Sequence, residues 1–138
     1  MSFLLDTNVI SEARKPRGSP RVKAWMASVR GADLFLSVLV VGEIRQGIER
    51  LRRRDPAQAA VYEAWLAGLH RDYASCILPI TADIAEEWGR MNVRDPVATI
   101  DGLLAATAKA RGLTLVTRNT ADLVRTGVPL LNPFEPLR

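Results

Sequence analysis

The sequence has few of the side chains that build disulfides, zinc sites or nucleophile–histidine pairs. Cys76 is the only cysteine and His70 the only histidine among 138 residues. A disulfide within the chain is therefore excluded, and so is a zinc site made from several Cys and His ligands. A lone cysteine fits a reducing cytoplasm. We interpret Cys76, beside an apolar run, as buried and inert, and His70 as a surface residue of a helix.

Long apolar runs and lysine are also scarce. No run reaches the roughly 18 apolar residues of a membrane span. The N-terminal stretch MSFLLDTNVISEARK has an acid inside its short apolar part and no charged region before it, unlike a secretory signal. We therefore expect a cytoplasmic protein without a membrane partner. The chain has 16 Arg and 3 Lys against 15 acids, a net charge of +4, and arginine is suited to bidentate phosphate contacts, which favours an anionic partner.

Short apolar runs alternate with longer segments of helical periodicity. This alternation predicts a parallel sheet that helices cover on both faces. We predict a single domain over residues 1–138, an α/β fold in which a three-layer α/β/α sandwich surrounds a mainly parallel sheet of four or five strands. The strands are expected at residues 3–5, 34–38, 77–80, 113–117 and 128–131.

Apolar side chains spaced three and four residues apart predict the helices. One helix is expected from Val40 to Arg54, a second from Pro56 to about Tyr73, and a third after Thr81 as its N-cap. The apolar face of the second helix would include Val61, Trp65 and Leu69. All three tryptophans, Trp25, Trp65 and Trp88, follow helical periodicity, so we expect them in the core or in a protein interface.

Four acids lie at or beside the predicted strand ends. Asp6 follows the apolar triplet 3–5, and Asp122 belongs to a short helix after the strand that ends at Thr117. Glu43 flanks an apolar helical stripe, and Asp101 opens a helix whose next turns contain Gly and Ala, which allow close packing on the sheet. Ligands of open α/β sheets bind outside the carboxyl ends of the strands. We therefore expect all four acids at one rim.

Each acid also has a simpler structural interpretation. Asp6 would be a helix N-cap, Glu43 a solvated helix residue, and Asp101 and Asp122 first-turn acids that the helix dipole favours. Taken singly, these are the commoner roles. Several converging carboxylates, however, repel one another and raise each other's pKa unless a hard cation binds them. The set as a whole predicts a site for Mg²⁺, with Mn²⁺ as the alternative.

Four segments resemble one known family: LLDTNVIS at 4–11, SVLVVGEIRQGI at 37–48, IDGLLAATAKARGLTLVTRNTADL at 100–123 and LLNPF at 130–134. They are similar to PIN domains of the VapC type, the ribonuclease toxins of bacterial type II toxin–antitoxin pairs, including their FitB-like branch. The resemblance extends from about Phe3 to Phe134. Many PIN domains carry an acid where this chain has Asn119, which leaves Asp122 for the fourth acidic position.

The resemblance implies a metal-dependent endoribonuclease, a hydrolase that cuts tRNA or another translation RNA. It assigns catalysis to Asp6, Glu43, Asp101 and Asp122. Asp6 and Asp101 would bind the metal directly, while Glu43 and Asp122 would hold metal-bound waters or a second ion.

Neutral and basic side chains complete the expected site. Three neutral side chains at the two strand ends would support the acids. They are Asn8, Thr117 and Asn119. The candidate RNA-binding residues lie in a flexible basic loop, at Arg14, Lys15 and Arg17.

The resemblance also implies partners. We expect a cognate VapB-type antitoxin, contact with DNA only through that antitoxin, and a homodimer or a higher assembly with the antitoxin. Surplus apolar surface on the two helices between residues 40 and 73 supports the homodimer. That surface would include Ile48, Leu51, Tyr62, Trp65, Leu66 and Leu69.

Two other functions compete with the toxin interpretation. One is a catalytically weak PIN-domain module that acts with a DNA-binding antitoxin in transcriptional autoregulation. The other is a receiver domain or haloacid-type phosphatase built around Asp6. The phosphatase is disfavoured because Asn8 stands where its motif needs a second Asp. The receiver is disfavoured because the chain lacks its acidic pair and the Lys after the last strand.

Overall fold

A parallel β-sheet forms the centre of the protein. The computed structural model describes residues 1–136, and within them the sheet has five strands in the order β3-β2-β1-β4-β5. Every neighbouring pair is parallel. The strands are β1 (Phe3–Leu5), β2 (Leu34–Ser37), β3 (Ile77–Leu78), β4 (Thr114–Val116) and β5 (Leu130–Leu131). The predicted α/β fold with a parallel sheet is confirmed.

The order of the strands reverses at β1. The chain first adds β2 and β3 on one side of β1 and then returns to add β4 and β5 on the other side. The register pairs Leu5 of β1 with Val116 of β4. Their successors, Asp6 and Thr117, therefore leave the carboxyl edge of the sheet side by side. A reversal of this kind opens a crevice at that edge, which is the usual ligand site of such folds.

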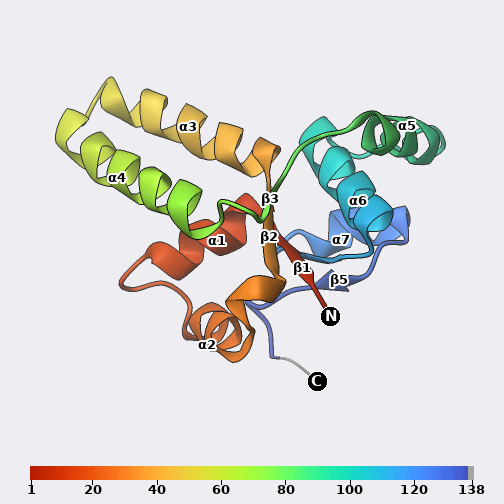
Figure 1. The fold of residues 1–138 in the computed structure, drawn as a ribbon, viewed down its shortest axis with the longest axis horizontal. Helices are drawn as coiled ribbons and strands as arrows, with labels where there is room; N and C mark the ends of the chain where they lie inside the picture. The colour runs from red at the N-terminus through yellow and green to blue at the C-terminus, as the bar shows by residue number, and fades with distance from the viewer. Residues whose placement is uncertain (137–138) are drawn as a thin grey trace.

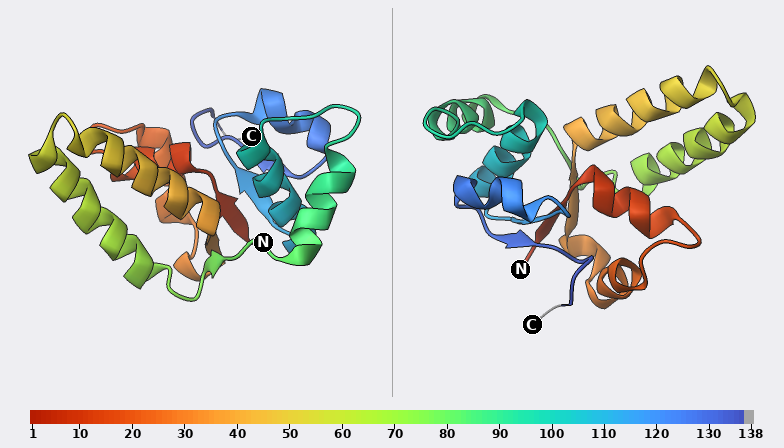
Figure 2. Two further views of the ribbon diagram at one scale, coloured as in Figure 1. Left: turned by 90° about the horizontal axis from the view of Figure 1, so that it is seen from above. Right: turned by 180° about the vertical axis from the view of Figure 1, so that it is seen from behind.

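Helices cover both faces of the sheet. The helices α3 and α4 form a hairpin on one side of the sheet, and α5, α6 and α7 lie on the other side (Figure 1). Figure 2 shows the same division from two further directions. None of the helices within residues 1–136 has the length and apolar character needed to cross a bilayer. The helices are α1 (Thr7–Arg14), α2 (Pro20–Ser28), α3 (Val38–Arg52), α4 (Pro56–Asp72), α5 (Ala82–Met91), α6 (Thr99–Arg111) and α7 (Thr120–Leu123).

The three inner strands contribute the most deeply buried side chains. Leu4, Leu36 and Leu115 are fully buried, one on each of these strands. The edge strands β3 and β5 are only half-buried. This difference explains why the inner strands are continuous apolar runs: helices cover both of their faces. It also explains why Cys76, directly before edge strand β3, is half-buried; the prediction that it is buried was wrong. His70 is exposed, as predicted.

Several predicted boundaries were wrong by a few residues. Ser37 ends β2, and its hydroxyl accepts the backbone N–H of Leu39 at 3.0 Å, so α3 begins at Val38 rather than Val40. Prolines shorten both edge strands, because β3 ends before Pro79 and β5 begins after Pro129. Val61 was also placed wrongly, since 55% of it is exposed on the outer face of α4.

The starts of α5 and α2 each show a detail that the prediction lacked. Thr81 precedes α5 as expected, but its hydroxyl contacts the Asp83 carboxylate and Arg111 instead of capping a backbone N–H. Helix α2 contains Trp25, which follows helical periodicity, but we predicted no start for this helix, although Ser19 and Pro20 together are a start signal. Trp25 of this helix is buried, and its ring meets Phe3 edge-on at 5.1 Å, as expected for a core residue.

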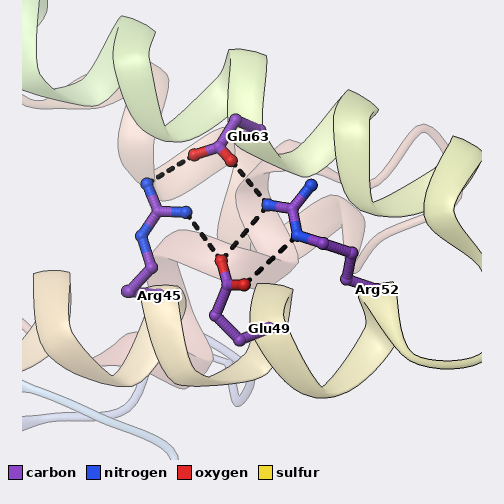
Figure 3. A network of polar contacts seen from close by, with 4 residues as sticks. All are labelled: Arg45, Glu49, Arg52 and Glu63. Atoms are coloured by element: carbon purple, nitrogen blue, oxygen red, sulfur yellow. Dashed lines mark hydrogen bonds and ion pairs between the residues drawn. The ribbon is translucent and has the colours of Figure 1, made fainter.

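Four charged side chains join α3 to α4 (Figure 3). Arg45 and Arg52 of α3 both contact Glu63 of α4, and both also contact Glu49 of their own helix. Hydrogen bonds from the two arginines lower the pKa of Glu63 to about 2. Exposed ion pairs contribute little stability singly. A shared network instead fixes how the two helices lie against each other, and their inner faces form part of a groove described below.

The contact of α6 with α5 yields a prediction about packing. A Cβ at Gly102 would lie 2.9 Å from Trp88 Nε1, a buried nitrogen without a hydrogen-bond partner among residues 1–136. Gly102→Ala should lower the free energy of unfolding by about 1–2 kcal/mol, because overpacking outweighs the gain in helix propensity. Denaturant unfolding measures the change.

Gly89→Ala on α5 is the matched control. A Cβ there has open space, so this variant should gain up to about 1 kcal/mol from helix propensity alone. Equal shifts for the two variants would contradict the close contact at Gly102.

Candidate active site

One pocket of about 510 Å³ opens at the point where the strand order reverses. Its walls come from the ends of β1 and β4 and from α1, α3 and α6. The structure thus brings together three of the four predicted acids. Thr117, fully buried, lies next to the pocket and bonds Asp6. The lining residues are Asp6, Thr7, Asn8, Ser11, Glu43, Asp101, Arg118 and Asn119.

Asp6 is the most constrained acid of the pocket. It is only 6% exposed. Its Oδ1 accepts the backbone N–H of Thr7 at 2.7 Å, so it caps α1, while its Oδ2 accepts the Thr117 hydroxyl at 2.7 Å and the Asn8 amide at 3.3 Å. Burial raises the pKa of Asp6 in spite of these bonds, and the charge of Glu43 adds to the rise. Asp6 is therefore both an N-cap and a pocket residue.

Glu43 and Asp101 each have one polar support. The Thr7 hydroxyl donates to Glu43 Oε1 at 2.6 Å, and the Asn119 amide donates to Asp101 Oδ2 at 3.1 Å. Asp101 lies in the first turn of α6, which begins at Thr99, so Asp101 does not itself open the helix. Burial raises the pKa of Asp101, and the nearby charges of Asp6 and Asp122 raise it further. These acids repel one another, as the predicted site requires.

Asp122 lies apart from the other acids. It is exposed on α7 and does not line the pocket, whereas Asn119 does. Its assignment to the fourth acidic position stays a prediction, supported only by its charge effect on Asp101. Within residues 1–136, no three His, Cys, Asp or Glu side chains form a ready metal-binding group. The acids share a pocket without closing a cage of three protein ligands.

Polar bonds link the two strand ends around the acids. Asn8 Oδ1 accepts the backbone N–H of Arg118 at 3.2 Å, and the Thr117 hydroxyl accepts that of Asn119 at 3.0 Å. These residues therefore support the site, as predicted, and also hold the backbone at the end of β4. Arg118 is a pocket residue that we did not predict. Its position directly after Thr117, at the end of β4, was the available signal.

Residues 14–20 form a short turn between α1 and α2 that hydrogen bonds connect, and the flexibility expected of this basic loop stays a prediction. The Glu12 carboxylate accepts the backbone N–H of Ser19 at 2.8 Å and contacts Lys15. Arg14 is the last residue of α1, and its guanidinium lies 4.0 Å from the centroid of the Tyr62 ring. Arg17 remains exposed. Of the three candidate RNA-binding residues, Arg14 stacks on an aromatic ring and Lys15 pairs with Glu12. Arg17 forms neither an ion pair nor an aromatic contact within residues 1–136.

A second, mainly apolar groove of about 410 Å³ adjoins the acidic pocket. The two share Thr7, Ser11 and Glu43. The groove continues between α3 and α4 along Ile44, Gly47, Ile48, Leu51, Arg54, Gln58, Tyr62 and Trp65.

The groove corrects our expectation about surplus apolar surface. Ile48, Leu66 and Leu69 are at most 6% exposed, because α3 and α4 pack on each other and α3 also contacts β2. Leu51, Tyr62 and Trp65 are half-buried and line the groove. The apolar surface is therefore a concave groove beside the acids, not a broad helical face.

The fold and the pocket define a class of protein: a parallel α/β domain with carboxylates at the reversal of its strand order. The chain belongs to the PIN domain family, whose model matches residues 3–128. It is 33% identical to Toxin FitB of Neisseria gonorrhoeae over 96% of this chain and 99% of that protein. It is 31% identical to VapC ribonuclease Y4jK of Sinorhizobium fredii over 97% of this chain and 99% of that protein.

A solved structure gives the same assignment. The structure of FitAB bound to the IR36 DNA fragment superposes with a TM-score of 0.91 at 31% identity, covering 99% of this chain and 98% of that one. The resemblance predicted from the sequence, to VapC-type PIN domains with a FitB-like branch, is confirmed.

The raised pKa of Asp101 yields a prediction about pH. The folded state binds a proton at Asp101 more readily than the unfolded chain, whose carboxyl has the ordinary pKa of 3.8. Charged Asp101 therefore destabilises the metal-free fold at neutral pH, and this effect disappears as the pH falls through the raised pKa. Asp101→Asn should stabilise the protein by up to about 1 kcal/mol at neutral pH and lose that advantage on acidification.

Denaturant unfolding in a chelator, from about pH 7 down to about pH 5, measures this difference. Asp6→Asn is the contrasting variant, because its new amide would face two donors, the Thr117 hydroxyl and the Asn8 amide. It should therefore destabilise the fold. If the difference in unfolding free energy between Asp101→Asn and wild type were the same at every pH, the charge of Asp101 would not destabilise the fold.

Proposed function

We propose that the chain is a metal-dependent endoribonuclease, the toxin of a type II toxin–antitoxin pair, which hydrolyses phosphodiester bonds in tRNA or another translation RNA. One observation carries the proposal. Asp6, Glu43 and Asp101 share one open pocket, and no Lys, Arg or His within residues 1–136 forms an ion pair with them. The names of the relatives, a toxin and a VapC ribonuclease, support the same activity.

Mg²⁺, or alternatively Mn²⁺, fits the donors that the pocket offers. Carboxylate oxygens are the preferred ligands of these hard cations. Burial raises the pKa of Asp101 and the charge of Asp6 raises it further, and a cation held between the two acids would relieve that repulsion. Because no three acids form a ready cage, Asp6 and Asp101 would hold an ion that keeps several waters. When bound, such an ion neutralises charge at phosphorus and activates water at neutral pH.

The residues of the chain would orient the reacting groups. Thr117, Asn8 and the N–H of Thr7 fix the Asp6 carboxylate, and Asn119 fixes one oxygen of Asp101. The Thr7 hydroxyl binds one oxygen of Glu43, which leaves the other free to orient a water molecule or accept its proton. Asp122 would act from farther away, through its charge.

An antitoxin segment would occupy the apolar groove beside the acids. The groove shares Thr7, Ser11 and Glu43 with the acidic pocket. An apolar helix or extended strand lying there would therefore bring an Arg or Lys within reach of the carboxylates, where it would satisfy the same charges as a metal. We propose a VapB-type partner that also makes the contact with DNA, as the similarity to FitAB bound to a DNA fragment suggests. A homodimer stays our expectation from the family resemblance.

The alternative function is a catalytically weak module that acts with such a partner in transcriptional autoregulation. The size and apolar lining of the groove favour it. It differs from the leading proposal in one measurable respect, because the isolated chain would then bind its partner without cutting RNA.

We predict that Asp101→Asn lowers RNA cleavage at least about 100-fold, because it removes one metal-ligand charge with little change of shape. Magnesium should stabilise wild type against heat through mass action and stabilise this variant much less. Cleavage of total tRNA, paired with thermal melts with and without magnesium, measures both effects. Asp95→Asn, an exposed acid paired with Arg125, is the control and should behave like wild type. Wild-type protein that leaves RNA intact would favour the binding module.

A second prediction concerns the groove. Gly47 lines it, and a Cβ there meets nothing within 4 Å, so Gly47→Gln should fill the groove without disturbing the fold. Affinity for the antitoxin encoded beside this chain should fall at least about tenfold, while RNA cleavage persists. Gly42→Gln is the matched control, since Gly42 is on the same helix with equally open space but outside the groove. Equal affinities of the two variants would place the antitoxin elsewhere.

A further inference from the structure

Arg118 places a cation at the mouth of the acidic pocket. It lines the pocket together with Asp6, Glu43 and Asp101. Its backbone is held from two sides, since its N–H donates to Asn8 Oδ1 at 3.2 Å and its carbonyl accepts the Asn132 amide at 3.4 Å. The position of Arg118 is therefore set by the ends of both central strands and by the chain after β5.

The guanidinium of Arg118 rests on an aromatic ring. Its Cζ lies 3.9 Å from the centroid of Phe134. Phe134 is half-buried against the core, and its N–H donates to Asn132 Oδ1 at 3.0 Å. Asn132 thus binds the backbones of both partners of the stack. The Arg118 side chain is therefore held on the Phe134 ring and does not extend freely into solvent.

Arg118 is not neutralised by a neighbouring acid. No carboxylate within residues 1–136 lies at ion-pair distance from it. Its charge contributes, as the last of several causes, to a lowered pKa of Glu12. A guanidinium stacked by its face keeps the N–H groups of its edge free to donate, and these groups match the oxygens of a phosphate.

We propose that Arg118, positioned by Phe134, is a phosphate-binding site that holds the RNA strand against the acidic pocket. The inference rests on the proposed nuclease function and names the group that brings the substrate there. Three carboxylates repel a phosphodiester, so the pocket needs a cation near its mouth. Stacking on Phe134 keeps that cation beside the acids without letting it pair with them and occupy the pocket.

The test compares RNA binding and cleavage for four full-length variants. Arg118→Met removes the charge, Arg118→Lys keeps it, and Phe134→Leu removes only the ring. Arg71→Met is the matched control, because Arg71 is an exposed arginine in the last turn of α4, before β3 begins and so away from the carboxyl edge of the sheet. The probe is a labelled single-stranded RNA oligonucleotide of mixed sequence, and each change is also introduced into the non-cleaving Asp101→Asn protein to measure binding alone.

Arg118→Met should lower kcat/KM about 10- to 100-fold, the effect of losing one charge-assisted phosphate contact. In the binding series, the dependence of affinity on salt should weaken by about one phosphate contact. Arg118→Lys should recover part of the loss. Phe134→Leu should raise KM while the salt dependence persists, since the charge remains but its position is lost. Magnesium should stabilise all four proteins as it does wild type.

Two results would overturn the proposal. One is an Arg118→Met protein whose RNA affinity and salt dependence equal those of Arg71→Met. The other is an Arg118→Lys protein as weak as Arg118→Met, with both losing thermal stability, because Arg118 would then act only in folding. The binding series does not need cleavage. If wild type fails to cut RNA, the proposed activity fails, while the comparison of affinities still decides the role of Arg118.

Discussion

The parallel pairing of β1 with β4 is the constraint on which the rest of the site depends. The N–H of Asp6 donates to the carbonyl of Val116 at 2.9 Å, which carries the ladder one residue past the end of β1. The Thr117 hydroxyl can then reach the Asp6 carboxylate. A slip of one residue would turn Thr117 to the other face of the sheet and leave a buried carboxylate with fewer donors. Register and site are therefore stabilised together, because the same contacts serve both.

The structural and functional interpretations of the acids turn out to be compatible. Asp6 caps α1 with one oxygen, and Asp101 lies in the first turn of α6, where the helix dipole favours a negative charge. Burial works in the opposite direction and raises the pKa of both. A helix N-terminus thus offsets part of the cost of holding a carboxylate in a pocket. Capping geometry is one way for a fold to keep acids close together before a cation binds.

The sequence predicted the strands, the parallel sheet and the acids that share the pocket, because each depends on local patterns of apolar and polar residues. Contacts between distant segments were not predictable in this way. Nothing local shows that Arg118 stacks on Phe134, or that Arg14 turns toward Tyr62. Burial of Ile48, Leu66 and Leu69 likewise depends on how α3 and α4 pack, so these residues were taken for free surface. Asp122 was expected at the same rim because it follows the strand that ends at Thr117, but it is exposed on α7 and does not line the pocket.

Aromatic stacking gives this fold a way to keep a cation near the acids without neutralising them. Arg118 lies on Phe134 beside the pocket, and Arg14 lies on Tyr62 beside the adjoining groove. An unconstrained arginine at position 118 would be drawn to the carboxylates of the pocket, since opposite charges attract strongly at partly buried sites. A ring face lowers the energy of the stacked position and leaves the guanidinium edge free. The acids then stay open to the metal we propose, while Arg118 stays open to a phosphate of the proposed RNA substrate.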